Sequence, residues 1–229
     1  MSLFAIADLH FSFGTNKPMN VFRGWNDYVN KLEKNWHAII SDNDTVVISG
    51  DISWALKLQD TEEDFKFLNS LPGKKILLKG NHDYWWGTKK KIDDYLKGKH
   101  FDTLSILFNN AYAVENFAVC GSRGWSYESD SEQDIKILNR EVNRLNTSIL
   151  QAKKFYLEPI VFLHYPPVYL NIECKEIMDV LLFHNIKKCY YGHLHGSNSH
   201  KRAVIGDYRG INFKLISCDY LDFLPILVI

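Results

Sequence analysis

A β-branched run leads directly into a glycine and an acid at residues 45–51, TVVISGD. Val and Ile favour strands, and an unbroken apolar run of this length is typical of a strand buried on both faces in an α/β protein. The acid at position 51 then lies where the strand ends. Four other short runs repeat this pattern, each ending at a polar residue or a glycine: Leu3–Ala7, Lys75–Lys79, Ile160–Leu163 and Lys188–Tyr191.

Helical patterns alternate with these strands. Apolar residues recur every three or four positions over Trp25–Ile39 and over Ile135–Ile149, which predicts two helices with core-facing stripes. An alternation of this kind predicts an α/β fold in which helices cover the outer faces of the sheets. Two helix starts are also predicted, each from a capping residue and an acid in the first turn: Asp60 with Glu63, and Ser131 with Asp134.

Two strand pairs complete the predicted elements. We expect the first within Ser105–Ser122, turning at Asn109-Asn110, and the second within Arg202–Cys218, turning at Asp207 or at Arg209-Gly210.

Length and composition favour one ordinary globular domain over residues 1–229. Hydrophobic residues make up 46% of the chain and charged residues 24%, and 27 basic side chains balance 27 acidic ones. A neutral chain has no overall positive field to gather nucleic acid or an anionic membrane. Its first residues lack the basic start of a signal peptide, and no apolar run is long enough to span a bilayer, so we expect a soluble cytoplasmic protein. The cysteines are far apart and are interpreted as buried small hydrophobes: Cys120, Cys174, Cys189 and Cys218.

Polar residues that can bind metals gather at the five strand ends. Because ligands in such folds bind beyond the carboxyl ends of the strands, we expect segments far apart in sequence to meet in one pocket. In an extended backbone, residues two apart point to the same side, which suits the pairs Asp8/His10 and His193/His195 as chelates. The full set comprises Asp8-Leu9-His10, Gly50-Asp51, Gly80-Asn81-His82-Asp83, His164-Tyr165-Pro166-Pro167 and Gly192-His193-Leu194-His195.

The chemistry of these groups points to divalent metals. Imidazoles, carboxylates and one amide oxygen, with no thiolate nearby, favour Mn, Fe, Zn, Ni or Co over a structural zinc site. One ion would not use so many ligands. Two ions about 3.5 to 4 Å apart would use them, and such pairs clamp the attacking and leaving oxygens in phosphoryl displacement.

In their order and spacing the five segments resemble the signature of the calcineurin-like metallophosphoesterases, D-x-H, G-D, G-N-H-[DE], H and G-H-x-H. The resemblance implies a four-layer sandwich of two mixed sheets flanked by helices, with a dinuclear metal site at the carboxyl ends of the strands. It also implies that a metal-bridging hydroxide attacks phosphorus, and Mn is the metal expected to support activity in vitro.

The resemblance further implies a role for each motif residue. One metal would be held by Asp8, His10, Asp51 and His195, and the other by Asp51, Asn81, His164 and His193, with Asp51 as the bridge. His82 would face the substrate as a general acid or a stabilising cation, and Asp83 would orient it.

The sequence departs from the motifs of particular branches of this family, and these departures narrow the class of substrate. The segment after Asp51 lacks the Asp-Arg-Gly of protein serine/threonine phosphatases, and Trp54 stands where purple acid phosphatases have a tyrosine ligand. His82 replaces the arginine of the lipid-A pathway pyrophosphatases. A phosphodiesterase-like enzyme remains, acting on a diester or monoester of a small molecule or nucleotide.

Several residues near the motifs have open roles. The aromatic residues Trp54, Tyr84, Trp85 and Trp86 either stack a nucleobase or pack beneath the site. Arg23 and Arg123 either approach a phosphate or lie solvated on the surface. Lys89, Lys90 and Lys91 are interpreted as a solvated helix face. The loop Phe11–Asn20 and the segment Arg123–Asp130 are expected to shape substrate choice.

Two other functions compete with hydrolysis. One is a binding scaffold that has kept the fold and lost turnover, although this chain keeps every motif residue. The other is an exonuclease subunit that relies on a DNA-binding partner. The sequence leaves the natural substrate and the oligomeric state open.

Overall fold

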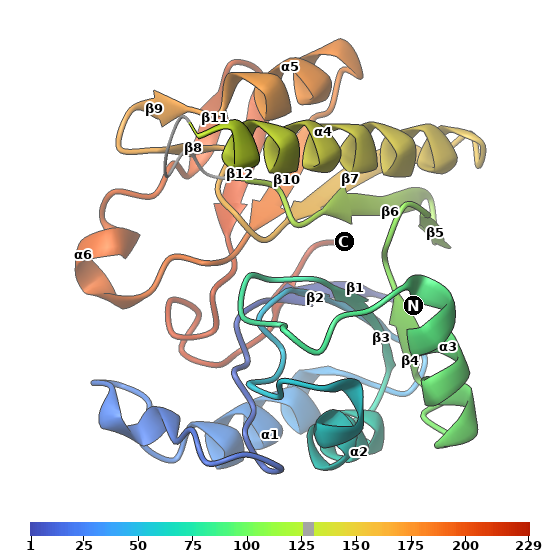
Figure 1. Ribbon diagram of the computed structural model, residues 1–229, viewed down its shortest axis with the longest axis vertical. Helices are drawn as coiled ribbons and strands as arrows, with labels where there is room; N and C mark the ends of the chain where they lie inside the picture. Colours follow the sequence, from blue (N-terminus) through green and yellow to red (C-terminus); the bar gives the residue numbers. More distant parts are fainter. Residues whose placement is uncertain (126–130) are drawn as a thin grey trace.

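The computed structural model describes residues 1–125 and 131–229. Two β-sheets pack face to face, and helices cover the outer face of each (Figure 1). The α/β sandwich of two mixed sheets predicted from the sequence is confirmed.

The first sheet has the strand order β13-β1-β2-β3-β4. Strands β1 to β4 are parallel, and β13 joins the edge of the sheet antiparallel to β1. The bounds are β1 (Leu3–Ile6), β2 (Thr45–Ser49), β3 (Lys74–Leu78), β4 (Leu104–Ile106) and β13 (Ile226–Leu227).

The second sheet has the order β11-β12-β10-β7-β6-β5, with antiparallel strands at its two edges and parallel strands between them. Its bounds are β5 (Tyr112–Val114), β6 (Phe117–Ser122), β7 (Glu158–Leu163), β10 (Lys188–Tyr191), β11 (Gly206–Tyr208) and β12 (Ile211–Leu215). A separate short ribbon pairs β8 (Val168–Tyr169) with β9 (Ile172–Glu173).

The helices form the two outer layers (Figure 1). On the first sheet lie α1 (Tyr28–Ile39), α2 (Glu62–Ser70) and α3 (Lys89–Gly98), and on the second lie α4 (Glu132–Lys153) and α5 (Lys175–Phe183). The short α6 (Gly196–His200) lies apart from both layers, and 3-10 turns occupy Met19–Val21 and Leu58–Thr61.

Alternating side chains divide the core into three layers. In β2, Val46 and Ile48 pack toward the helices of the first sheet, whereas Val47 points into the layer between the sheets. In β6, Cys120 packs toward the helices of the second sheet and Val119 joins the inter-sheet layer. Apolar contact thus contributes to holding the two sheets together. All four cysteines are buried, as predicted.

Three local predictions need correction. Asn109-Asn110 does not turn a hairpin: β4 pairs with β3 in the first sheet, so this segment crosses to β5 in the second, and the hairpin joins β5 to β6. Asp60 does not cap a helix, because a 3-10 turn precedes α2, which begins at Glu62. Ile39 and Ile135, at the ends of their stripes, are exposed.

Other local predictions are confirmed. Ser131 caps α4 by accepting a hydrogen bond from the N–H of Asp134 at 3.1 Å. Arg209 and Gly210 turn the hairpin between β11 and β12 with positive φ angles of 54° and 80°, the conformation of a type I′ turn.

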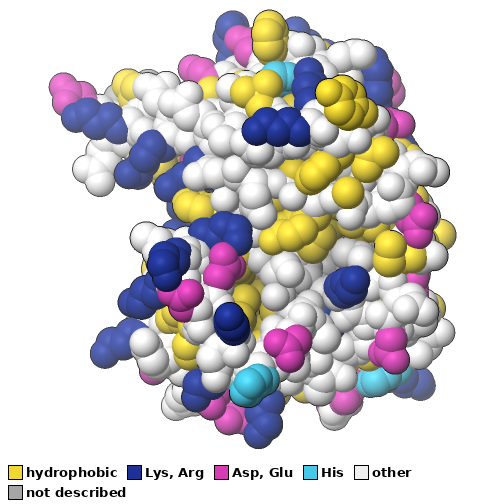
Figure 2. Space-filling view, turned by 90° about the vertical axis from the view of Figure 1, so that its right-hand side faces the viewer, with side chains coloured by type: hydrophobic (Ala, Val, Ile, Leu, Met, Phe, Trp, Pro, Cys, Tyr) yellow, Lys and Arg dark blue, Asp and Glu magenta, His cyan; other side chains and the backbone are white. Residues whose placement is uncertain are grey.

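Figure 2 shows the right-hand side of Figure 1, away from α6. On this face a band of apolar side chains crosses the middle, and basic side chains are interspersed with acidic ones above and below it rather than forming a continuous basic surface. Within residues 1–125 and 131–229, no helix combines the length and apolar character needed to cross a membrane.

Candidate metal centre

The carboxyl ends of strands from both sheets meet at one place. The N–H of Asp8, after β1, donates to the carbonyl of Gly50 after β2, at 2.9 Å. The N–H of Gly192, after β10, donates to the carbonyl of His164 after β7, at 3.1 Å. Ala7 pairs with Ser217, which brings the end of the first sheet to the end of the second. The predicted convergence of distant segments is therefore present in the fold.

Four side chains form a first group. The Nε2 atoms of His10 and His195 lie 3.3 Å apart. The Oδ2 of Asp51 is 3.7 Å from the Nε2 of His10, and the Oδ1 of Asp8 is 3.8 Å from the Nε2 of His195. Asp8, His10 and His195 present ligand atoms close enough together to hold one metal ion.

A second group lies beside the first and shares Asp51. The Oδ1 of Asn81 is 2.6 Å from the Nε2 of His164 and 2.9 Å from the Nδ1 of His193. The Oδ2 of Asp51 is 3.6 Å from the same Nε2 of His164. Because this oxygen also faces His10, one carboxylate oxygen of Asp51 lies between the two groups.

Hydrogen bonds on the far side of two rings fix their orientation. The Nδ1 of His164 lies 3.0 Å from the carbonyl of Ser49, and the Nδ1 of His195 lies 3.0 Å from Asp219 Oδ1. Each Nδ1–H can donate to its acceptor, which leaves the lone pair of Nε2 facing the cluster, as a metal-ligating imidazole requires. Asp219 was not predicted as a site residue, although it lies shortly after the end of β12 at Leu215.

The electrostatics of the cluster favour bound cations. Burial raises the pKa of Asp8 to about 7, with the charge of Asp51 adding to the effect and His195 opposing it. Burial also raises the pKa of Asp51 and lowers that of His164 to about 3. Buried carboxylates, together with the imidazoles of His10, His164 and His193, whose pKa values burial lowers, form a donor set that fits divalent metal ions.

The backbone of the cluster is strained in several places. Four of its non-glycine residues have positive φ angles: Asp8 (64°), His10 (48°), Asp51 (51°) and His193 (71°). Such conformations are uncommon and gather at functional sites. Gly80 is also required here, because a Cβ at this position would lie 2.1 Å from the Oδ1 of Asp51.

His82 lies beside the two groups. Its backbone N–H donates to the Oδ1 of Asp51 at 2.8 Å, which positions that carboxylate. Its ring is half-buried, with ring centroids 4.4 Å from Trp54 and 5.7 Å from His10, and burial lowers its pKa.

Asp83 has different partners from those expected. Its Oδ2 accepts the N–H groups of Asp51 and Gly80, and its Oδ1 accepts those of Ile52 and Ser53 and the indole N–H of Trp85. No hydrogen bond joins it to His82 among the residues that the structure describes. Asp83 therefore holds the turn that carries Asp51, and the expectation that it orients the His82 ring needs correction.

The nearby aromatic residues divide into two kinds. Trp85 is buried and donates to Asp83, so it packs beneath the site, and Trp86 packs against it with centroids 4.9 Å apart. Trp54 stacks on His10 at 4.9 Å, while Lys17, from the loop Phe11–Asn20, lies over the Trp54 ring at 4.7 Å. Tyr84 is exposed.

The remaining candidates are also placed. Arg23 is exposed, whereas Arg123 is half-buried and ion-paired with Glu141. Lys89 and Lys90 form ion pairs along α3, consistent with a solvated helix face. The segment Arg123–Asp130 is described only as far as residue 125, so the expectation for residues 126–130 lies outside the described residues.

The ring of His195 predicts a pH dependence. Burial opposes its protonation, but the hydrogen bond to Asp219 and the charges of Asp8 and Asp51 outweigh burial and raise its pKa from 6.5 to about 9. The stability from this proton is complete below pH 6.5 and is lost as the pH rises through 9. In the presence of chelator we expect the unfolding free energy to fall by roughly 1–2 kcal/mol over this range, and by less in Asp219→Asn. Urea titrations at both pH values measure the difference, and an equal fall in both proteins would contradict the assignment.

The strand ends of this two-sheet α/β sandwich carry a candidate divalent-metal site. Its donors are carboxylates, imidazoles and an amide oxygen. The chain belongs to the calcineurin-like phosphoesterase family, whose sequence model matches residues 1–197. In general terms it is therefore a metal-dependent phosphoesterase.

Solved structures show the same fold at low sequence identity. A protein of unknown function from Aquifex aeolicus, AQ665, is 18% identical with a TM-score of 0.54, and the match covers 99% of this chain and 95% of that one. Phosphopantetheinyl hydrolase from Mycobacterium tuberculosis is 15% identical with a TM-score of 0.52, covering 100% and 95%. TT1561 of Thermus thermophilus is 12% identical with a TM-score of 0.54, covering 84% and 81%. A comparison with curated protein sequences found no match.

Proposed function

We propose that this protein is a dinuclear-metal phosphohydrolase that cleaves a phosphodiester or phosphomonoester of a small molecule or nucleotide. The observation that carries the proposal is the position of the Asp51 Oδ2, which faces His10 of one group at 3.7 Å and His164 of the other at 3.6 Å. A carboxylate shared in this way suits a pair of cations better than a single one.

The ligands divide into two sets that share the bridging residue. One ion would be held by Asp8, His10, Asp51 and His195, and the other by Asp51, Asn81, His164 and His193. When bound, the two ions would supply an activated water and neutralise the charge on the phosphoryl group.

The remaining site residues would act on the substrate or hold the ligands in place. We assign His82 to the leaving oxygen, because its ring lies beside His10 and its backbone N–H already fixes Asp51. It would donate a proton or a hydrogen bond there. Asp83 and Asp219 would act through other residues, the first through the turn that carries Asp51 and the second through the orientation of His195.

The proposal predicts activity that depends on added metal. We expect the metal-stripped protein to be inactive toward bis-p-nitrophenyl phosphate and to release p-nitrophenol once Mn²⁺ is restored to about two ions per chain. Fe²⁺, Zn²⁺, Ni²⁺ and Co²⁺ form the comparison series, and p-nitrophenyl phosphate tests monoester cleavage. Absence of turnover of either ester with two ions bound per chain would contradict the proposed hydrolase.

A further inference from the structure

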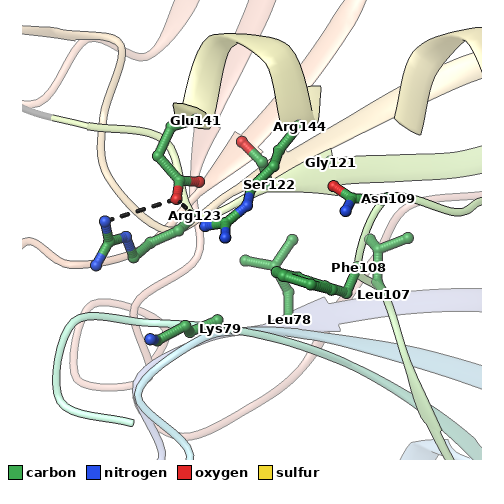
Figure 3. A pocket seen from close by; sticks show the side chains of 10 residues that line it. All are labelled: Leu78, Lys79, Leu107, Phe108, Asn109, Gly121, Ser122, Arg123, Glu141 and Arg144. Carbon is green, nitrogen blue, oxygen red and sulfur yellow. Dashed lines mark hydrogen bonds and ion pairs between the residues drawn. The ribbon is translucent and has the colours of Figure 1, made fainter. Parts of the chain in front are cut away.

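A small cavity between the two sheets gathers basic side chains beside the candidate metal centre (Figure 3). Its lining includes Lys79 from the end of β3, Arg123 from the end of β6 and Arg144 from α4, together with Glu141. The enclosed volume is about 10 Å³, which is room for a single water. A larger anion would therefore sit at the mouth of the cavity rather than inside it.

Glu141 organises the two arginines. Its side chain is 1% exposed, and its Oε1 accepts from the Nη1 of Arg144 at 2.5 Å and lies 3.6 Å from the Nη2 of Arg123. The guanidinium of Arg123 also stacks over Trp125 at 4.7 Å, and that of Arg144 stacks over Phe108 at 4.8 Å. Aromatic faces and a buried carboxylate thus hold both cations in place before any ligand arrives.

The charges of this cluster do not balance. Among the described residues that line the cavity, Lys79, Arg123 and Arg144 face the single carboxylate of Glu141, and the charge of the buried Asp83 also acts on Lys79, so cations outnumber carboxylates here. In the part of the chain that the structure describes, the side chain of Lys79 forms no hydrogen bond or ion pair, and the buried Nε of Arg123 and the buried Oε2 of Glu141 have no partner. A half-buried group of cations that served the fold alone would be expected to be neutralised. A single water in the cavity can satisfy the buried Arg123 and Glu141 atoms, and the surplus of cations, with the Lys79 ammonium unpaired, points to an anion at the mouth.

The cluster lies directly beside the proposed ligands. The carbonyl of Arg123 accepts the N–H of His164 at 3.1 Å, and Lys79 immediately precedes Gly80 and Asn81 in the chain. Figure 3 shows the side chains of Lys79 and Arg123 extending in the same direction, away from Phe108. Both cations can therefore contact one anionic group, and their backbones place that group next to the proposed ligands.

We infer that Lys79 and Arg123 bind a second phosphate of the substrate, so that the substrate class is a small molecule with two phosphate groups, one cleaved at the metal centre and one retained here. This inference rests on the proposed function. Arg144 and Glu141 position Arg123. A guanidinium fork and an ammonium group together match the oxygens of a phosphate dianion.

The test measures binding by calorimetry on the metal-loaded protein. The probes are methylphosphonate, which carries one phosphonate, and alkane bisphosphonates with spacers from methylene to butylene. We expect one spacer length to bind about tenfold more tightly than methylphosphonate, and this ratio to fall to about twofold or less in Arg123→Gln and in Lys79→Gln. Phosphonocarboxylates with the same spacers show whether a carboxylate serves equally well.

Two matched variants serve as controls. Arg140 on α4 and Lys74 on β3 are exposed, so Arg140→Gln and Lys74→Gln should keep the wild-type ratio. Lys79→Gln leaves the pairing of Glu141 intact, so it remains informative if Arg123→Gln unfolds.

The outcomes test the second phosphate site and the proposed hydrolase separately. An unchanged ratio in both Arg123→Gln and Lys79→Gln, or equal binding of every bisphosphonate and methylphosphonate, overturns the second phosphate site. Equal gains for the phosphonocarboxylates overturn the assignment to phosphate and leave a general anion site. A ratio that falls as expected in a protein without metal-dependent turnover upholds the anion site and contradicts the proposed hydrolase.

Discussion

Asp51→Asn should lower the metal-dependent turnover of bis-p-nitrophenyl phosphate by about 1000-fold or more. The Oδ2 of Asp51 faces His10 in one group and His164 in the other, so a neutral amide would remove the charge shared by both proposed metal sites. The measurement is the steady-state rate at saturating Mn²⁺, with the metal content of each protein determined alongside.

The same substitution should leave the fold intact. Asn keeps an oxygen that can accept the N–H of His82, and burial raises the pKa of Asp51, so its charge is unfavourable in the metal-free protein. In chelator at about pH 8 the variant should therefore melt at or above the wild-type temperature. Asp102→Asn, an exposed acid, is the matched control and should retain wild-type turnover. Retention of a tenth of wild-type turnover by Asp51→Asn would refute the bridging role.

Asp83→Ala should cost about 3 kcal/mol or more of unfolding free energy at pH 7. The two oxygens of this fully buried carboxylate accept five N–H groups, and alanine would leave these donors unpaired in the interior. Asp83→Asn keeps one acceptor oxygen and should lose less. Urea unfolding of the metal-free proteins gives both values, and Asp94→Ala on the exposed face of α3 provides the baseline.

This experiment also separates two roles for Asp83. If Asp83→Ala unfolds at the wild-type urea concentration while only turnover falls, the carboxylate acts on the chemistry through His82, as the sequence motif implied. A large loss of stability instead assigns it to the turn that carries Asp51.

The positions of the site residues along the chain could be predicted because strand ends follow simple rules. β-branched runs predict strands, parallel strands end at the same edge, and His10 or His164 at such an end must lie near that edge. The partners of Asp83 could not be predicted in this way. They depend on the positive φ angles of Gly50 and Asp51, which turn successive N–H groups toward one carboxylate.

One site residue was overlooked and one turn was misassigned for similar reasons. Asp219 was overlooked because the predicted strand pair extends to Cys218, whereas β12 ends at Leu215. The sequence pattern therefore did not show that Asp219 lies beyond a strand end. The turn at Asn109-Asn110 was misassigned because a local pattern does not reveal that neighbouring strands belong to different sheets. Both depend on contacts between residues far apart in sequence.

The proposed metal ligands come from both halves of the sandwich. Asp51 and Asn81 follow strands of the first sheet, whereas His164 and His193 follow strands of the second, and an apolar layer lies between the two sheets. Ions bound between them would act as reversible cross-links. By thermodynamic linkage, a substitution in that layer weakens metal binding to the degree that it populates a state in which the sheets are apart, however far it lies from the ions.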